Sequence, residues 1–400
     1  GDTVKVGQLI GEAGGFVSAP VYASISGTVA SVDNFMKFAG NYVKSITIAS
    51  DGRNEPLETL TPPDVHDLES FLHAVNDSGV VGQGGAGFPS AVKLVVKDLD
   101  QIEAIIINGA ECEPYVTSDT RTMLDRTDEV WEGILMLQEY YRAKRIIIAI
   151  EENKPECIQR FRALCENTQG IEVAALPHMY PQGGEKMQVK AVTGREVKPG
   201  GIPSGVGCNV VSTRTAYAIY QACYEGKPVI ERIVTVAGSA LKAPVNALTR
   251  VGTPFEYLAE QCGGFVKTPR KIVLGGPMMG ICATSFEAPT IKGTAGVLFF
   301  TEEEDRHVEH PTCIRCGKCI TVCPMNLEPV FMYMYYNKGD FEMMQKYHIT
   351  DCFECGSCAF NCPARMPLTH AFKTAKLMFQ AKAAKEKAAA EAKAAKEAQK

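Results

Sequence analysis

Two runs, CIRCGKCITVCP at residues 313–324 and CFECGSCAFNCP at residues 352–363, decide the fold of this part of the chain. Each run places four cysteines as Cys-x2-Cys-x2-Cys-x3-Cys and ends in proline. Three cysteines at x2 spacing wrap one iron–sulfur cubane, while the fourth lies too far along the turn and reaches the other cluster. The spacing therefore predicts two [4Fe–4S] clusters. One takes Cys313, Cys316, Cys319 and Cys362, and the other takes Cys352, Cys355, Cys358 and Cys323.

Zinc is the alternative occupant of these runs, because zinc sites also use cysteine pairs at x2 spacing. Two identical four-cysteine runs that each end in proline fit zinc poorly, so we favour the clusters. Gly317 and Gly356 let the backbone approach a cubane closely. A helix is expected at 328–337, between the runs, which indicates a more helical domain than a minimal bacterial ferredoxin. Paired clusters relay single electrons without choosing a substrate, so a donor site is expected elsewhere.

Composition limits the class of protein. With 400 residues, 46% hydrophobic and 22% charged, the chain is long enough for several folded domains. Its formal net charge of −5 does not favour a nucleic-acid partner. Most of its 15 cysteines lie in the two runs, which favours metal binding in a reducing compartment. No apolar run reaches the roughly 20 residues that span a bilayer. The chain starts at Gly1 inside a patterned segment, so we expect residues to be missing upstream.

Residues 1–60 have the pattern of a small β barrel or sandwich. Glycines separate short strand signals near 3–4, 8–10, 16–17, 27–29 and 45–48. The order of these segments resembles the lipoyl/biotinyl fold. A carrier domain of that fold needs a lysine on its exposed hairpin, and no lysine lies between Lys5 and Lys37. We therefore expect a non-lipoylated domain that serves structure or docking.

The remaining chain divides by its secondary-structure signals. Alternating strands and helices over residues 61–225 predict an α/β domain with a parallel sheet. Residues 226–300 predict a small α+β unit, residues 301–375 the cluster domain, and residues 376–400 an Ala/Lys/Glu-rich tail that forms a solvated helix or a frayed linker. Strands are expected at 103–109, 145–150, 233–236 and 271–274, and helices at 128–141, 156–166 and 254–262.

A glycine-rich loop at residues 81–90 is the candidate ligand site. Four glycines within six residues let backbone amides approach a phosphate or a flat ring, although a plain flexible loop has the same composition. Lys93 follows closely and is positioned to meet a phosphate. The segment 108–115 follows a hydrophobic strand, where α/β folds place ligands. A second glycine turn at 180–186 opens a helix.

These motifs carry a family resemblance. The Gly-x-Gly-Gly-Ala-Gly-Phe-Pro loop at 82–89, Asn-x-x-Glu-x-Glu-Pro at 108–114 and Tyr-x-x-Gly-x-Glu at 180–185 resemble the FMN- and NADH-binding subunit of respiratory complex I. The whole chain more closely resembles the C-subunit family of the Rnf complex, a membrane-bound ferredoxin:NAD⁺ oxidoreductase of bacteria. Segments shared with that family include 193–197 and 275–280. The family has a β-grasp soluble-ligand-binding domain where residues 226–300 fall.

The resemblance implies roles for individual residues. The resemblance implies that FMN and the nucleotide approach Gly82, Gly84, Gly85 and Gly87, and that the flavin contacts Lys93, Asn108, Tyr180, Gly183 and Gly184. The resemblance also places Glu111 near the flavin ring, Glu113 and Glu185 on NADH, and Phe88 beside the nicotinamide. The alternative for the carboxylates is a solvated loop position, and for Phe88 and Tyr180 it is core packing. We interpret Cys112 as a packing residue.

Two positions depart from the family pattern. Gln83 stands where complex I relatives usually have arginine, so one phosphate contact is expected to be missing. Ser212 occupies a position where the family usually shows an asparagine on the flavin. Both departures predict weaker flavin binding than in relatives.

The resemblance implies a multidomain α/β protein with a lipoyl-like β domain, a Rossmann-like FMN/NADH domain, a β-grasp domain and a helical two-cluster ferredoxin domain. It implies an enzyme subunit, peripheral on the cytoplasmic side of the bacterial inner membrane. Hydride would pass between NAD(H) and FMN, without a catalytic acid or base, and single electrons would pass through the clusters. Partner subunits would couple this to ion translocation, and ferredoxin would act indirectly. The alternatives are a cobalamin reductase of bacterial microcompartments and a flavin-less relay subunit.

Overall fold

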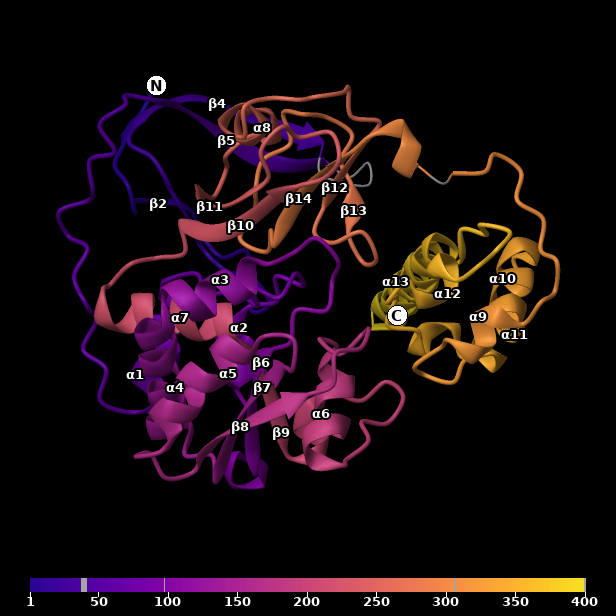
Figure 1. Ribbon diagram of the computed structural model, residues 1–400, viewed down its shortest axis with the longest axis horizontal. Helices are drawn as coiled ribbons and strands as arrows, with labels where there is room; N and C mark the ends of the chain where they lie inside the picture. Colours follow the sequence, from indigo (N-terminus) through magenta and orange to yellow (C-terminus); the bar gives the residue numbers. More distant parts are fainter. Residues whose placement is uncertain (37–41, 97, 306, 399–400) are drawn as a thin grey trace. The chain divides into compact units, whose positions relative to one another are not determined.

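The computed structural model describes residues 1–36, 42–96, 98–305 and 307–398. The chain forms two compact units, Gly1–Asp305 and Arg306–Lys400 (Figure 1). Among the described residues, none of the helices has both the length and the apolar character needed to cross a bilayer.

The N-terminal segment forms a β structure, as predicted. Strands β1 (Thr3–Val4), β4 (Gly27–Met36) and β5 (Tyr42–Ser50) make an antiparallel sheet in the order β1-β4-β5, and β2 (Leu9–Gly11) pairs with β3 (Val21–Tyr22). The strand predicted at 16–17 is wrong. Phe16 and Val17 form an exposed bend in the β2–β3 connection. Gly14 and Gly15 precede this bend, and glycine loses the most backbone entropy in a strand.

Residues 104–212 of the first unit contain a four-stranded parallel sheet, which confirms the predicted α/β pattern. Its order is β8 (Ile171–Leu176), β7 (Arg145–Glu151), β6 (Ala104–Gly109) and β9 (Cys208–Ser212). Both faces of the sheet are buried. Along β6, Ile105 and Ile107 enter one core while Ala104 and Ile106 enter the other, because side chains alternate along a strand.

Helices cover both faces of this sheet (Figure 1). Four of the longer ones bury residues in the larger core and one in the smaller core. The four are α1 (Leu68–Asp77), α4 (Thr127–Tyr141), α5 (Pro155–Cys165) and α7 (Thr213–Tyr224), and the one is α6 (Glu185–Thr193). Helices α4 and α7 approach closely at Gly133, where an added Cβ would stand 2.0 Å from the carbonyl oxygen of Ala216. The predicted helices at 128–141 and 156–166 are confirmed as α4 and α5.

The five-stranded sheet of the first unit is mixed. Its order is β11 (Val245–Arg250), β10 (Glu231–Ala237), β14 (Gly296–Phe300), β12 (Lys271–Leu274) and β13 (Ile281–Cys282). Strands β10 and β14 run parallel, and the other neighbours are antiparallel. Helix α8 (Phe255–Gln261) packs Phe255 against Phe299 and Val234 in a separate core.

Short helices complete the first unit. They are α2 (Ser90–Leu94), η2 (Leu99–Gln101), α3 (Ser118–Asp125), η3 (Pro203–Val206) and η4 (Glu302–Glu304).

The second unit is helical, as expected. It contains α9 (Lys318–Thr321), α10 (Pro329–Lys338), α11 (Phe341–Lys346), η5 (Ile349–Asp351), α12 (Ser357–Phe360) and α13 (Leu368–Ala398). Met332, Met344 and Phe372 are fully buried in its core. The helix expected in the tail is the continuation of α13, which is exposed throughout residues 380–391.

Candidate functional site

The glycine-rich loop closes one wall of a cavity at the carboxyl ends of β6 and β9. Its ends are tied together, because Gly82 N–H donates to the Phe88 carbonyl at 2.7 Å and Gly87 N–H donates to the Gly82 carbonyl at 3.1 Å. The cavity has a volume of about 190 Å³. Its lining consists of Gly82, Gly84, Ala86, Phe88, Ser90, Lys93, Leu94, Asn108, Gly183, Glu185, Val210, Val211, Ser212, Thr215 and Ile219. Parallel α/β sheets bind ligands at this end of their strands.

The loop leaves its backbone open. A Cβ added at Gly85 or Gly87 would meet nothing within 4 Å, and one added at Gly84 would meet only Ser212 Cβ, at 4.0 Å. Gly85 and Gly87 have φ of +110° and +64°, which side chains rarely adopt. The glycines therefore create space beside the cavity rather than internal packing, and this fits a flat or phosphorylated ligand that approaches main chain.

Lys93 on α2 and Glu185 at the start of α6 form an ion pair within the lining. Both side chains are partly exposed, so the pair contributes little to folding. A phosphate entering the cavity would compete with Glu185 for the ammonium group of Lys93. The Lys93 position therefore fits an anionic ligand group.

Asn108 holds the second glycine turn against the end of β6. Its Nδ2 donates to the Gly183 carbonyl at 2.9 Å, and its Oδ1 accepts from Gln188 Nε2 at 2.7 Å and from Ala110 N–H at 3.1 Å. Gly183 lies so close that an added Cβ would stand 2.9 Å from the Ala110 carbonyl oxygen. Two motifs separated by about seventy residues in the sequence are thus brought together at one edge of the cavity.

Other candidate residues lie outside this lining. Glu111 is buried and accepts from Asp119 N–H at 2.7 Å and from the Thr120 amide and hydroxyl. Burial, followed by the charge of Asp119, raises the pKa of Glu111 to about 7. The carboxylate of Glu113 accepts from Met279 N–H at 2.8 Å and Met278 N–H at 3.0 Å.

Gly85, Gly87, Tyr180 and Gly184 are also not among the lining residues, although Gly85 and Gly87 belong to the loop and Gly184 adjoins Gly183. Burial raises the pKa of the Cys112 thiol to about 11, and Gly183 N–H donates to its sulfur at 3.3 Å. Cys112 is therefore a packed thiol, in keeping with its interpretation as a packing residue.

The two departures from the family pattern have local roles. Ser212 caps α7, because its Oγ accepts from Thr215 N–H at 3.2 Å. Gln83 is buried, and its N–H donates to Thr215 Oγ1 at 3.1 Å. Thr215, Ser90 and Ile219 line the cavity but were not predicted from sequence. The available signal was the run 208–215, whose end coincides with the end of a buried strand.

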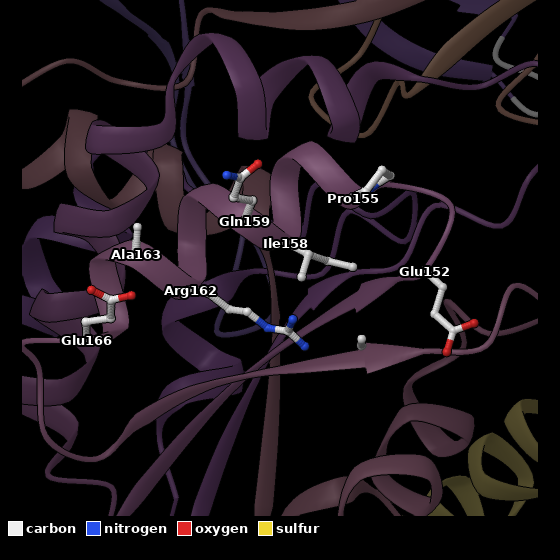
Figure 2. Close-up of a pocket in the computed structure, with 8 residues that line it drawn as sticks. Glu152, Pro155, Ile158, Gln159, Arg162, Ala163 and Glu166 are labelled. Atoms are coloured by element: carbon white, nitrogen blue, oxygen red, sulfur yellow. The ribbon is translucent and has the colours of Figure 1, made fainter.

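A second cavity, of about 480 Å³, lies between α5 and the edge strand β8. Figure 2 shows Ile158 and Arg162 directed from the helix toward the strand, with Glu152 at one end. None of the candidate site residues lines it, and its charged groups do not converge on one point. Although larger, it lacks the open glycine backbone, so the glycine-loop cavity remains the candidate site.

In the second unit, cysteines of the two runs lie near one another. Burial raises the pKa of Cys319, and the nearby thiols of Cys362 and Cys313 raise it further. Burial raises the pKa of Cys358 to about 12, and Cys352, Cys355 and Cys323 lie close enough to add to that shift. Cys362 therefore lies near a cysteine of the first run and Cys323 near a cysteine of the second, which is compatible with the predicted ligand sets. Cluster assembly would require these thiols to lose their protons, since thiolates are the ligands.

The two cysteine loops repeat the same backbone conformation. Positive φ angles recur at matching places, at Arg315 and Glu354, at Gly317 and Gly356, and at Asn326 and Arg365. The amides of Arg315 and Glu354 each donate, at 3.4 Å, to the sulfur of the first cysteine in their run. Among the described residues, no three potential ligands converge on a single metal ion. A cubane spreads its ligands over four iron atoms, so the predicted clusters do not require three ligands on one metal ion.

Family models match four successive segments of the chain. They are an RnfC barrel sandwich hybrid domain at residues 1–53, a Nuo51 FMN-binding domain at 75–221, an SLBB domain at 233–281 and a 4Fe-4S dicluster domain at 312–366.

Curated relatives cover most of the chain. The C subunit of the proton-translocating ferredoxin:NAD(+) oxidoreductase complex of Clostridium ljungdahlii is 39% identical, over 88% of this chain and 78% of the relative. The C subunit of the Na(+)-translocating complex of Acetobacterium woodii is 37% identical, over 94% and 86% respectively. A solved NAD⁺-reducing [NiFe]-hydrogenase shares the fold at 18% identity and a TM-score of 0.52, over 79% of this chain and 55% of that one. The chain belongs to the C-subunit family of ion-translocating ferredoxin:NAD⁺ oxidoreductases, the Rnf complexes.

Proposed function

We propose that this chain is the subunit of an ion-translocating ferredoxin:NAD⁺ oxidoreductase complex that binds FMN and NAD(H) and relays electrons through two [4Fe–4S] clusters. The observation that carries the proposal is the combination, on one chain, of an open glycine loop at the carboxyl ends of β6 and β9 with two four-cysteine runs whose cysteines lie near one another. FMN, when bound, exchanges a hydride with NAD(H) and single electrons with clusters.

In this proposal the chain binds and orients the reactants. The main chain at Gly84, Gly85 and Gly87 would let the cofactor approach closely, and Lys93 would hold its phosphate in place of Glu185. Phe88, 42% exposed at the mouth of the loop, provides an aromatic surface for the nicotinamide. Glu185, once released from Lys93, and Glu113 would contact NADH. In this structure the carboxylate of Glu113 accepts hydrogen bonds from the 276–280 loop, so a contact between Glu113 and NADH would require that loop to move.

We further propose a division at residues 60, 225, 300 and 375, into lipoyl-like, Rossmann-like, β-grasp and ferredoxin-like domains followed by the Ala/Lys/Glu-rich tail. The subunit would lie on the cytoplasmic side of the inner membrane, bound to other subunits of the complex. Reduced ferredoxin would supply electrons through those subunits rather than to this chain directly.

Anaerobic purification of the full chain tests the proposal. We expect bound or reconstitutable FMN, together with iron and acid-labile sulfide in equal amounts. NADH should bleach the flavin absorbance and then reduce the clusters, seen by electron paramagnetic resonance. Zinc in place of iron, or FMN that NADH cannot reduce, would overturn the proposal. Clusters without any FMN binding would favour the relay alternative, and corrinoid reduction would favour the cobalamin reductase.

A further inference from the structure

The glycine-rich loop is supported from behind by the mixed-sheet segment of the same unit. The turn at 291–294 is closed by Thr294 N–H, which donates to the Ile291 carbonyl at 2.9 Å. At its centre, a Cβ added to Gly293 would stand 3.2 Å from the Gly85 carbonyl oxygen. The main chain of this turn therefore packs directly against the main chain of the loop.

Arg232 on β10 joins the turn to the loop. Only 3% of this residue is exposed. Its guanidinium donates through Nη2 to the Gln83 carbonyl at 3.2 Å and through Nη1 to the Lys292 carbonyl, while its Nε has no hydrogen-bond partner among the described residues. Burial lowers the pKa of Arg232, but arginine starts so high that its charge persists at neutral pH.

Within the described part of the chain, no carboxylate neutralises this charge at contact distance. The negative charge of Asp119 is near enough to stabilise the guanidinium of Arg232. However, Asp119 forms an ion pair with Arg214, and the positive charge of Arg214 repels that of Arg232. Across the residues that the structure describes, Arg232 takes part in no ion pair within 4.0 Å. A buried cation without a counter-ion costs several kcal/mol in most proteins. We therefore expect Arg232 to have a function that offsets this cost in stability.

The hydrogen bond to Gln83 indicates what that role is. In a trans peptide, the carbonyl and the following N–H point in opposite directions. With the Gln83 carbonyl facing Arg232, the N–H of Gly84 points away from Arg232, and Gly84 lines the cavity. A charge-assisted bond to the carbonyl polarises the same peptide, so the Gly84 N–H becomes a stronger donor.

We propose that Arg232 is a positioning residue for the phosphate of the cofactor. It fixes the Gln83–Gly84 peptide and places a positive charge behind the glycine-rich loop. This inference rests on the proposed binding of FMN in the cavity. It also gives Gln83 a defined place, because the guanidinium reaches the backbone carbonyl of that residue from β10.

The experiment compares FMN with riboflavin, which has the same ring system but no phosphate. Flavin-depleted full chain with intact clusters is titrated with each, and dissociation constants are measured by fluorescence quenching. For Arg232→Gln we expect FMN binding to weaken at least tenfold and riboflavin binding to change less than twofold. Arg232→Lys, which keeps the charge, should recover part of the FMN affinity.

A matched control is Arg250→Gln. Arg250 lies on β11 of the same sheet and donates to the carbonyl of Ser24, away from the glycine-rich loop. This variant should bind FMN as the wild type does. The melting temperature of flavin-depleted Arg232→Gln should equal or exceed that of the wild type, because the substitution removes an uncompensated buried charge.

The outcomes are separable. Equal weakening of FMN and riboflavin together with a lower melting temperature would make Arg232 a structural residue and overturn the inference. Unchanged FMN affinity in Arg232→Gln would also overturn it. If the wild type itself binds no FMN, the proposed function fails before Arg232 is tested.

Discussion

Gly84→Ala is expected to separate flavin binding from folding. Gly84 lines the cavity, its φ is not positive, and the nearest atom to an added Cβ is Ser212 Cβ at 4.0 Å. The new methyl group therefore meets only ordinary van der Waals contact in the protein. Replacing glycine by alanine at a permitted φ stabilises a fold by roughly 0.4–1 kcal/mol through the unfolded chain. The melting temperature should stay the same or rise slightly.

The same methyl group occupies space that the cofactor needs. Forcing an extra methyl group into a filled site costs about 1–3 kcal/mol. The dissociation constant for FMN should therefore be roughly 5 to 150 times larger than in the wild type. The assay is fluorescence titration of flavin-depleted protein, paired with a thermal melt of the same sample. Gly205→Ala is the control, because Gly205 has open space around it and lies outside the cavity lining.

The reasoning would be refuted by either of two results. If Gly84→Ala binds FMN as tightly as the wild type, the cofactor does not approach the loop at this position. If the variant melts several degrees lower, the loop is packed more tightly than the contacts indicate, and weaker binding would then carry no information about the cavity.

Three further predictions concern the clusters, pH dependence and packing. Cys362→Ser should lose about half of the iron and sulfide. Its thiolate is predicted to bind the cluster of the first run, so the cluster bound by Cys352, Cys355 and Cys358 should remain. Cys282→Ser changes an exposed cysteine outside both runs and should lose neither cluster. Burial raises the pKa of Glu111 to about 7 in the folded protein, so Glu111 keeps its proton to higher pH than in the unfolded chain. Unfolding therefore releases a proton between these two pKa values. The free energy of unfolding should fall by up to about 3 kcal/mol as the pH rises from about 4.5 through about 7. Denaturant titrations at several pH values should show that slope in the wild type and not in Glu111→Gln. Gly133→Ala would place a Cβ 2.0 Å from the Ala216 carbonyl oxygen. This clash should lower the free energy of unfolding by roughly 1–3 kcal/mol or more, measured as a lower denaturation midpoint.

The elements that sequence predicts best are those whose pattern is set by burial on two faces. The run of isoleucines in β7 is fully buried, so its length and type are clear before any fold is known. The cysteine ligand sets stay a prediction, which rests on ligand spacing rather than on burial. The strand predicted at 16–17 is wrong, because two apolar residues do not form a strand without a neighbouring strand to pair with. Arg232 gave no signal, because its significance depends on a contact with Gln83 across 149 residues.

Several predicted contact residues are already occupied by partners within the protein, and the strength of those partnerships differs. The Lys93–Glu185 ion pair is partly exposed, and such pairs are worth about 0–1 kcal/mol. A phosphate can therefore displace Glu185 at small cost. The carboxylate of Glu113 accepts two backbone hydrogen bonds from Met278 and Met279, and bonds to a charged group are worth about 1.5–3 kcal/mol each.

This difference gives the two residues unequal roles. Lys93 can change partners when a cofactor arrives, whereas a ligand that recruits Glu113 must also compensate for two amides left without their acceptor. An added Cβ at Gly276 would stand 2.1 Å from the Glu113 carboxylate, so the 276–280 loop is shaped around this side chain. Loss of activity in a Glu113 variant would therefore combine a lost ligand contact with a disordered loop, and the carboxamide, which keeps one acceptor oxygen, disturbs the loop least.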